Sequence, residues 1–270
     1  MSLKNTKNVE PNGFGCVAIC LLPTNILILR FDLIMKEVLK LIEAKKQEFS
    51  QLPLFQYMQD TSIDPRQRLA WAPCAAPFIM SFGDLNKYIF RESSCDPIQI
   101  LINKHTYEDD HHWLWFIRDI RNLELDKSLK FSDSLEFLWG EEAEKPRWVT
   151  YQLCRFALQA TPIQKLIVVE VTEATGNVMF SVAAKLGKEI KSIIQKDCLY
   201  FDDFHLAVET GHTTGSTEID QILAKIQLSE QEQLEAFELV EKVFNLFTQM
   251  TNCFLTYAQK HQVKQLVKLG

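Results

Sequence analysis

The sequence predicts an all-α protein, and three observations support this prediction. Glycine is scarce, at 9 of 270 residues, below its average share of about 7%. Residues that favour helices, chiefly Leu, Glu, Gln, Lys and Ala, are common. No convincing run of alternating apolar and polar residues marks a strand. We therefore expect a bundle of about seven helices in one domain.

Composition excludes several classes of function. Hydrophobic residues make up 47% of the chain and charged residues 24%, with a net charge of −6; this is ordinary for a soluble globular protein and argues against a nucleic-acid partner. The seven cysteines are odd in number and never form C-x-x-C. A disulfide framework or thiolate zinc site is therefore not expected, and a cytoplasmic location fits better.

The chain shows no linker that would divide it into two domains. We expect a single helical domain over residues 33–270, preceded by an N-terminal extension of uncertain structure over residues 1–32. The apolar run from Phe14 to Phe31 contains Pro23 and Arg30. It is therefore a poor membrane span, and no membrane partner is expected.

The first three helices are marked by apolar periodicity and by Asp-Pro pairs. Periodicity predicts a helix over residues 33–50. An Asp-Pro pair at 64–65 opens a second helix, because proline is well placed in a first turn. A second such pair at 96–97 opens a third helix, which reaches about Leu123.

The second half begins with a polar, acidic stretch at residues 131–146, which we interpret as a loop. Gly187 is expected to be a helix C-cap, and Ser229 with Glu232 forms a capping-box pattern before the last helix. Residues 211–217 are expected to form a loop. The helices predicted here cover residues 148–160, 162–187, 189–210 (with an interruption near 197) and 229–262.

His205, Glu209 and His212 are the first candidates for a functional site. With about 100° of rotation per residue, Glu209 lies about 40° to one side of His205 and His212 about 20° to the other. Burying two imidazoles and a carboxylate is costly unless they bind something. These ligand types suit iron, manganese or zinc. The alternative is a helix end whose polar groups face solvent; we favour a metal site.

A second group of histidines lies in the third predicted helix. Relative to the apolar stripe of that helix, His105, His112 and Asp119 lie within about 60°, Glu108 lies about 75° away, and His111 lies about 135° away and faces outward. Glu108 and His112 are the preferred ligand pair. His105 and Asp119 are reserves, as ligands or as partners that orient an imidazole. A solvated acidic turn is the alternative.

A further carboxylate is expected from the fifth predicted helix. Glu173 lies at the centre of its apolar stripe and Glu170 at the edge, and a glutamate in a core rarely lacks a partner. The small residues Ala174, Thr175 and Gly176 would open room for substrate or allow close helix packing. The predicted metal ligands are Glu108, His112, Glu173, His205, Glu209 and His212.

This set resembles the heme-oxygenase-like di-metal oxidases and oxygenases, in which an acid and a histidine, then a glutamate, then H-x-x-x-[DE]-x-x-H supply the ligands. The group includes the chlamydial death-domain-associating protein and shares its fold with thiaminase II-type proteins. Residues 53–85 are also similar to its opening helices, and the likeness covers about Met35 to Lys260. Glu209 stands where the family usually has aspartate, and Glu108 with His112 meets the first motif only loosely.

The resemblance implies a seven-helix fold, two iron ions (or iron and manganese) and oxidation of a small organic molecule by O₂. Amines, amino acids and fatty acids are the implied substrate classes. Heme is not expected, because no histidine precedes His105. The alternatives are an interaction or ligand-binding protein without a competent site and a single-metal zinc hydrolase. The sequence leaves a homodimer open, and it identifies no catalytic residue beyond the ligands.

Overall fold

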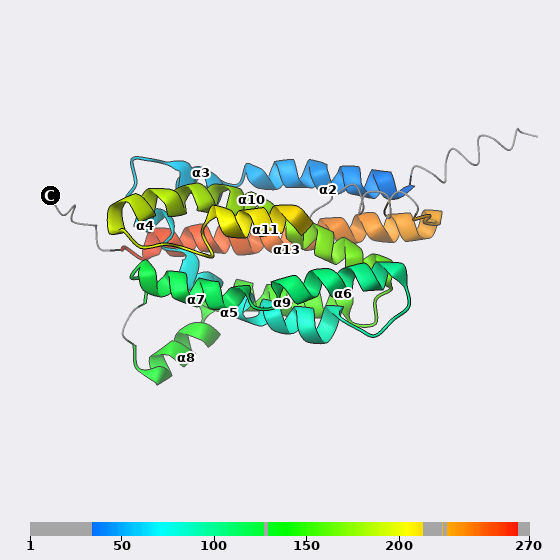
Figure 1. Cartoon of the computed structure of the whole chain (residues 1–270), viewed down its shortest axis with the longest axis horizontal. Coiled ribbons are helices and arrows are strands. Elements are labelled where there is room, and N and C mark those ends of the chain that lie inside the picture. The colour runs from blue at the N-terminus through cyan, green and yellow to red at the C-terminus, as the bar shows by residue number, and fades with distance from the viewer. Residues whose placement is uncertain (1–33, 127–128, 213–222, 224–225, 264–270) are drawn as a thin grey trace, which may run out of the picture.

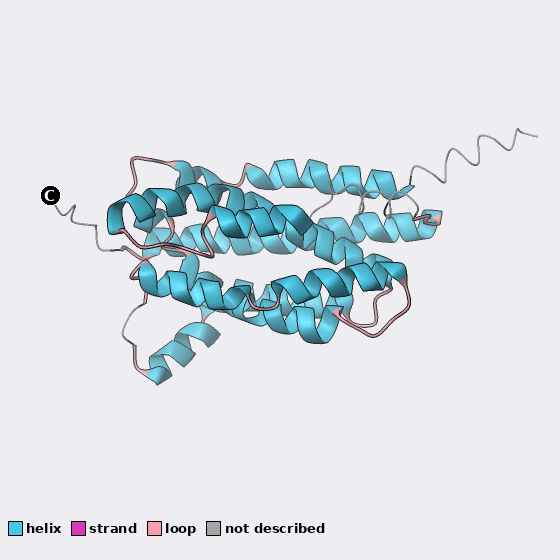
Figure 2. Cartoon of the chain, viewed as in Figure 1, coloured by secondary structure: helices cyan, strands magenta, loops and turns pink. Residues whose placement is uncertain are grey.

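The structure, a computed structural model, describes residues 34–126, 129–212, 223 and 226–263. All regular structure in these ranges is helical, and no strand occurs among them (Figure 2). The prediction of an all-α protein is confirmed. The predicted extension, residues 1–32, lies outside the described residues.

The elements run along the chain in the order given by their residue ranges. They are α2 (Ile34–Ser50), α3 (Pro53–Gln59), α4 (Pro65–Arg68), α5 (Ala72–Leu85), the π-helix η1 (Asn86–Phe90), α6 (Pro97–Asp109), α7 (His112–Asn122), α8 (Phe131–Trp139), the 3₁₀ helix η2 (Glu141–Ala143), α9 (Glu144–Ala157), α10 (Pro162–Ile194), α11 (Asp203–His212) and α13 (Glu230–Lys260).

The centre of the molecule is α10, which packs against α2, α6, α9, α11 and α13. Figure 1 shows α2, α10, α11 and α13 in one layer, with α5, α6, α7 and α9 beside it. Among the described helices, α10 alone is long and apolar enough to cross a membrane. However, 72% of its most apolar 18-residue stretch is buried within the protein. That burial is what a core helix of a globular bundle requires.

Two capping boxes set the starts of the two longest helices. The Thr161 side chain accepts a hydrogen bond from the Gln164 N–H, and Pro162 follows as the first helical residue of α10. At α13, the Ser229 side chain accepts a hydrogen bond from the Glu232 N–H, and the Glu232 side chain accepts one from the Ser229 N–H. Each box satisfies N–H groups that have no partner inside the helix. The predicted start of the last helix is confirmed.

Several of the predicted elements and boundaries were wrong. Residues 131–139 form α8 rather than a loop; α8 buries no residue, so its polar content was no barrier to helix formation. Gly187 lies inside α10, which continues to Ile194 and ends at Gln195 in the left-handed conformation (φ 57°). The next helix therefore starts only at Asp203.

The predicted third helix is in fact two, because α6 ends at Asp109 and α7 begins at His112. This break matters for the candidate site. A rotation of 100° per residue applies only within one continuous helix, so facing angles carried from α6 across the break into α7 do not hold.

Candidate metal site

The junction between α6 and α7 is held close to α5. Arg91 donates hydrogen bonds to the Thr106 carbonyl at 2.7 Å and to the Asp110 carboxylate at 2.9 Å. A Cβ atom at Gly83 of α5 would lie 2.6 Å from the Asp110 carbonyl oxygen, so only glycine permits this approach. The junction thereby fixes Asp109 as the last residue of α6 and His112 as the first of α7.

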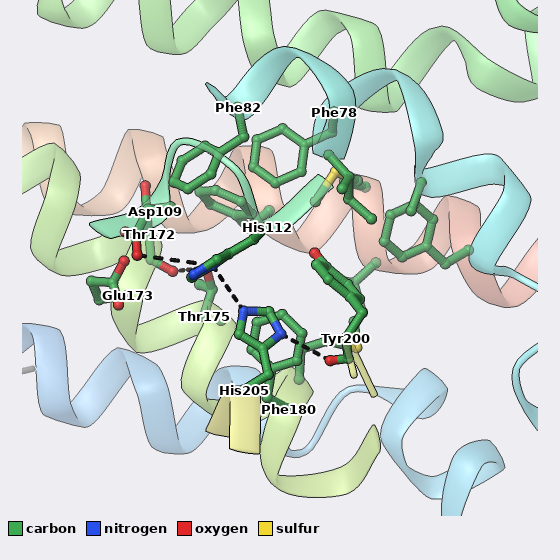
Figure 3. Close-up of a pocket in the computed structure, with 18 of the residues that line it drawn as sticks. Phe78, Phe82, Asp109, His112, Thr172, Glu173, Thr175, Phe180, Tyr200 and His205 are labelled. Carbon is green, nitrogen blue, oxygen red and sulfur yellow. Dashed lines mark hydrogen bonds and ion pairs between the residues drawn. The ribbon is translucent and has the colours of Figure 1, made fainter. Parts of the chain in front are cut away.

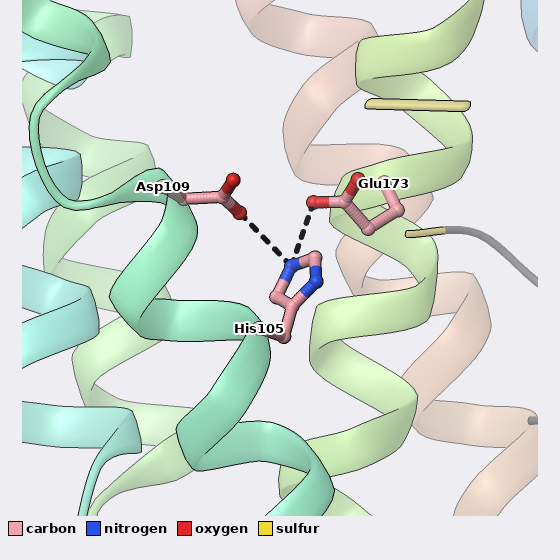
Figure 4. Close-up of side chains that lie close together, drawn as sticks. All are labelled: His105, Asp109 and Glu173. Atoms are coloured by element: carbon pink, nitrogen blue, oxygen red, sulfur yellow. Dashed lines mark hydrogen bonds and ion pairs between the residues drawn. The ribbon is translucent and has the colours of Figure 1, made fainter. Parts of the chain in front are cut away.

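His105, Asp109 and Glu173 form the first part of the site. His105 Nε2 lies 3.1 Å from Glu173 Oε1 and 3.0 Å from Asp109 Oδ2 (Figure 4). One potential ligand atom from each residue lies within 4.8 Å of the others. Asp109 and Glu173 are 2% and 3% exposed. Two buried carboxylates around one imidazole are a set of donors that a divalent metal ion satisfies.

The charge state of His105 is set by these neighbours. Burial alone would lower the pKa of His105, but the negative charges and hydrogen bonds of Glu173 and Asp109 outweigh it and hold that pKa well above 6.5. Without a metal ion, the imidazolium therefore balances part of the carboxylate charge. A metal ion would replace the proton in that role.

His112 and His205 form the second part of the site. His205 Nδ1 lies 2.8 Å from the Tyr200 carbonyl oxygen, and its Nε2 lies 3.1 Å from His112 Nδ1 (Figure 3). A carbonyl oxygen only accepts, so Nδ1 of His205 carries the proton and its Nε2 lone pair faces the site. Such a bond from the far ring nitrogen is typical of metal-ligating histidines. His112 Nδ1 also lies 3.9 Å from Asp109 Oδ1, which joins the two parts.

Asp119 holds the loop that orients His205. Its buried carboxylate accepts hydrogen bonds from the backbone N–H groups of Leu199, Tyr200 and Phe201, at 2.8–3.0 Å. Burial raises the pKa of Asp119, although the three backbone bonds oppose this. The sequence left two roles open for Asp119, as a metal ligand or as a partner that orients an imidazole. This arrangement fits the orienting role. Asp119 acts through the Tyr200 carbonyl.

Gly187 lets the same loop lie directly on α10. A Cβ atom at this position would lie only 1.8 Å from the Phe201 carbonyl oxygen. The glycine that we predicted as a helix end is therefore a contact point, where the backbone of the loop meets the backbone of α10.

The structure brings three of the predicted ligands together: His112, Glu173 and His205. Glu209 and His212 follow His205 on α11, but their side chains lie outside the described residues. Of the predicted triad, the structure therefore places only His205, and the roles of Glu209 and His212 stay predictions.

The remaining candidates lie as follows. His105, a reserve in the sequence, is at the centre of the first cluster. Glu108 is exposed on α6, whereas Asp109 beside it is buried. Glu170 is buried one turn before Glu173 on α10, and His111 is exposed, as predicted.

Sequence reasoning missed Asp109. The signal was its position four residues after His105, which places both on one helix face. The facing angles were measured from an apolar stripe that was assumed to continue from α6 into α7. Because the helix breaks at residues 110–111, these angles were wrong, and Glu108 was chosen as the ligand in place of Asp109.

A cavity of about 100 Å³ adjoins the site. Its polar residues include Asp109, His112, Glu173 and His205, and its other walls are largely aromatic and aliphatic side chains from α5, α10 and α13 (Figure 3). Among the described residues, no lysine or arginine lines it. The metal-ligand candidates thus lie at the edge of an apolar chamber.

The sequence matches no protein-family model, and no curated protein matches it. What the structure itself establishes is an all-helical bundle with a buried cluster of histidine and carboxylate side chains beside an apolar cavity.

Proposed function

We propose that this protein is an O₂-activating, non-heme di-metal oxidase or oxygenase with a heme-oxygenase-like fold. One observation carries the proposal: Asp109, His112, Glu173 and His205 converge from four helices on one apolar cavity, and His105 contacts both Asp109 and Glu173. Ligands that project inward from several helices of a bundle are the usual construction of di-metal carboxylate sites.

The proposal assigns one metal ion to each part of the site. His105, Asp109 and Glu173 would hold one ion, and His112 with His205 would contribute to the second, while Asp109 lies between the two groups. Glu209 and His212 are the further ligands that the sequence predicts from α11. Two iron ions, or iron with manganese, would when bound supply the electrons that reduce O₂.

The protein orients the imidazole rings of the site and keeps water away from them. The Tyr200 carbonyl fixes the His205 ring, and Trp115 stacks on His112 with ring centroids 4.3 Å apart. Phe180 lies against His205 at 4.1 Å. These aromatic faces exclude water from the imidazoles, which strengthens the electrostatic interactions within the site.

The cavity narrows the substrate class. An apolar cavity of about 150 Å³ holds a benzene molecule, so a cavity of about 100 Å³ suits a group smaller than one benzene ring, such as a short alkyl chain. The apolar walls favour a substrate that presents a hydrocarbon or aromatic group, within the amines, amino acids and fatty acids that the resemblance implies.

A reducing, cytoplasmic setting is part of the proposal. The five described cysteines, at positions 74, 95, 154, 198 and 253, are all free thiols. Free thiols in this number are typical of proteins kept in a reducing compartment.

A second candidate is an interaction protein, and α8 favours it. Phe131, Leu135 and Trp139 recur every four residues along this helix, and Phe131 and Trp139 are 79% and 67% exposed. Exposed aromatic residues on one helix face are a feature of protein-binding surfaces.

Metal analysis of protein purified without chelators separates the candidates. We expect about two iron ions per chain, or one iron with one manganese, and loss of metal in His205→Ala and Glu173→Ala. His111→Ala is the matched control, since this exposed histidine lies beside the site without entering it. Folded protein without metal would favour the interaction protein, and one zinc ion alone would favour the hydrolase.

A further inference from the structure

Two cysteines far apart in the sequence meet behind the cavity wall. Cys74 lies in the first turn of α5 and Cys253 near the end of α13, 179 positions apart, and their Sγ atoms are 3.9 Å from each other. Both Sγ atoms also face the backbone carbonyl oxygen of Glu142, at 3.1 Å and 3.4 Å. The two thiols are thus in contact in the reduced protein.

The pair is covered by η2 and open from one side. The Glu142 side chain accepts a hydrogen bond of 2.9 Å from His261, whose ring stacks on Tyr257. This interaction holds η2 over the thiols. Cys74 is fully buried, whereas Cys253 is partly exposed, so a small reagent from solvent would reach Cys253 first.

The two thiols share a hydrogen bond in which either sulfur can be the donor. The hydrogen bond between the thiols and the burial of Cys74 raise the pKa of Cys74 well above its ordinary value. The same hydrogen bond lowers the pKa of Cys253, to which the positive charges of Lys145 and Lys260 also contribute, although burial opposes them. A thiolate is the form of cysteine that attacks an oxidant.

We propose that Cys74 and Cys253 are a redox modification site, which a hydroperoxide converts into a reversible disulfide. The Cys253 thiolate attacks one oxygen of hydrogen peroxide and displaces hydroxide, which takes up a proton to leave as water, and a sulfenic acid forms on Cys253. The Cys74 sulfur, losing its proton, then attacks the Cys253 sulfur and displaces a second water. In total, two thiols and one peroxide give one disulfide and two waters.

Formation of the bridge requires a short approach of the two sulfur atoms, from 3.9 Å to about 2.05 Å. The bridge would tie α5 to α13. Ala75 and Phe254, the residues that follow the two cysteines, both line the cavity, so oxidation would fix two of its walls. This inference does not depend on the proposed metal chemistry.

The test is peroxide oxidation of the purified full-length chain. After treatment with hydrogen peroxide, catalase quenching and alkylation, peptide mass spectrometry should find a Cys74–Cys253 linked peptide that dithiothreitol removes. Closure of so long a loop restricts the unfolded chain, so Tm should rise by about 5 °C or more on oxidation.

Variants make the test specific. Cys253→Ser should show neither the linked peptide nor the rise in Tm; it changes a partly exposed residue, so the fold should persist. Cys95→Ser, at an exposed cysteine, is the matched control and should behave as the wild type does. A wild-type protein in which Cys253 becomes sulfinic acid while Cys74 stays reduced would overturn the proposal, as would an equal rise in Tm in Cys253→Ser.

Discussion

At the scale of the residue, the site depends on how each imidazole is held. His205 is 1% exposed and has a fixed partner at each ring nitrogen, the Tyr200 carbonyl and His112. The peptide group that carries the Tyr200 carbonyl is in turn held by Asp119, whose carboxylate accepts hydrogen bonds from three successive N–H groups. The direction of the His205 lone pair therefore depends on the Asp119 carboxylate, which acts through the backbone of this loop.

Asp119→Asn should weaken metal binding and leave the fold intact. Asparagine has the same shape, but it has no negative charge and its amide group cannot accept at every position where the carboxylate does. We expect metal affinity to fall by about 10- to 100-fold, as for other orienting partners of ligands, measured by titration with a competing chelator. Asp197→Asn, in the same loop but exposed, is the control. Equal affinities in both variants would contradict this role.

The pKa of His105 predicts how the stability of chelator-treated protein varies with pH. Glu173 and Asp109 hold that pKa above 6.5 in the folded state. The stabilisation is therefore fully present below about pH 6.5, the value for the unfolded chain, and is lost as the pH rises through the folded-state pKa. The difference in Tm between wild type and His105→Gln should shrink from pH 6 to pH 9. With His111→Gln there should be little difference at either pH. A constant or growing difference for His105→Gln would refute the assignment.

At the scale of the element, the ends and contacts of the helices position the ligands. The α6–α7 break places Asp109 and His112 at adjoining helix ends, and Gly187 lets the loop before α11 lie on α10. Each feature involves a close approach of one backbone segment to another, of Gly83 to Asp110 in the first case and of Gly187 to Phe201 in the second.

Gly187→Ala should therefore move the loop. Alanine is the better helix former by about 1 kcal/mol, but its Cβ would meet the Phe201 carbonyl oxygen at 1.8 Å, and overpacking costs about 1–3 kcal/mol. We expect a lower free energy of unfolding in urea, together with weaker metal binding. Lys185→Ala, at an exposed position of α10, should change neither. A stabilised Gly187→Ala variant would show that the loop does not rest on α10.

The elements also show what could be predicted from the sequence. Local signals were reliable: the Asp-Pro pair at 96–97 and the capping box at 229 begin helices in the structure. Glu173 and His205 were found because each lies in a strongly patterned segment. The α6–α7 break was missed because its cause, the approach of Gly83 to Asp110, joins segments that are apart in the sequence. Asp109 was missed with it.

At the scale of the whole molecule, the bundle buries several imidazole and carboxylate side chains beside one apolar cavity. α10 supplies the glutamate and a large share of the core, while α6, α7 and α11 supply the remaining ligand candidates from its flank. Buried carboxylates and imidazoles are costly without a counter-charge. Metal binding should therefore contribute to the stability of the whole fold.

Removal of metal should lower Tm for this reason. A metal ion that binds the folded chain at a concentration of 100 times its Kd stabilises it by about 2.7 kcal/mol. Calorimetry of protein with and without chelator treatment should show a fall of several degrees, reversed by ferrous iron under anaerobic conditions. The chelator should not change Tm in Glu173→Ala.

The most direct test of the di-metal proposal is X-ray diffraction from a crystal of the iron-loaded protein, recorded on both sides of the iron absorption edge. The proposal predicts two anomalous peaks, one among His105, Asp109 and Glu173 and the other beside His112 and His205. With one iron and one manganese ion, the iron peak would fall sharply below the iron edge and the manganese peak would persist. No peak between these side chains, in crystals where the same residues are ordered, would contradict the proposal.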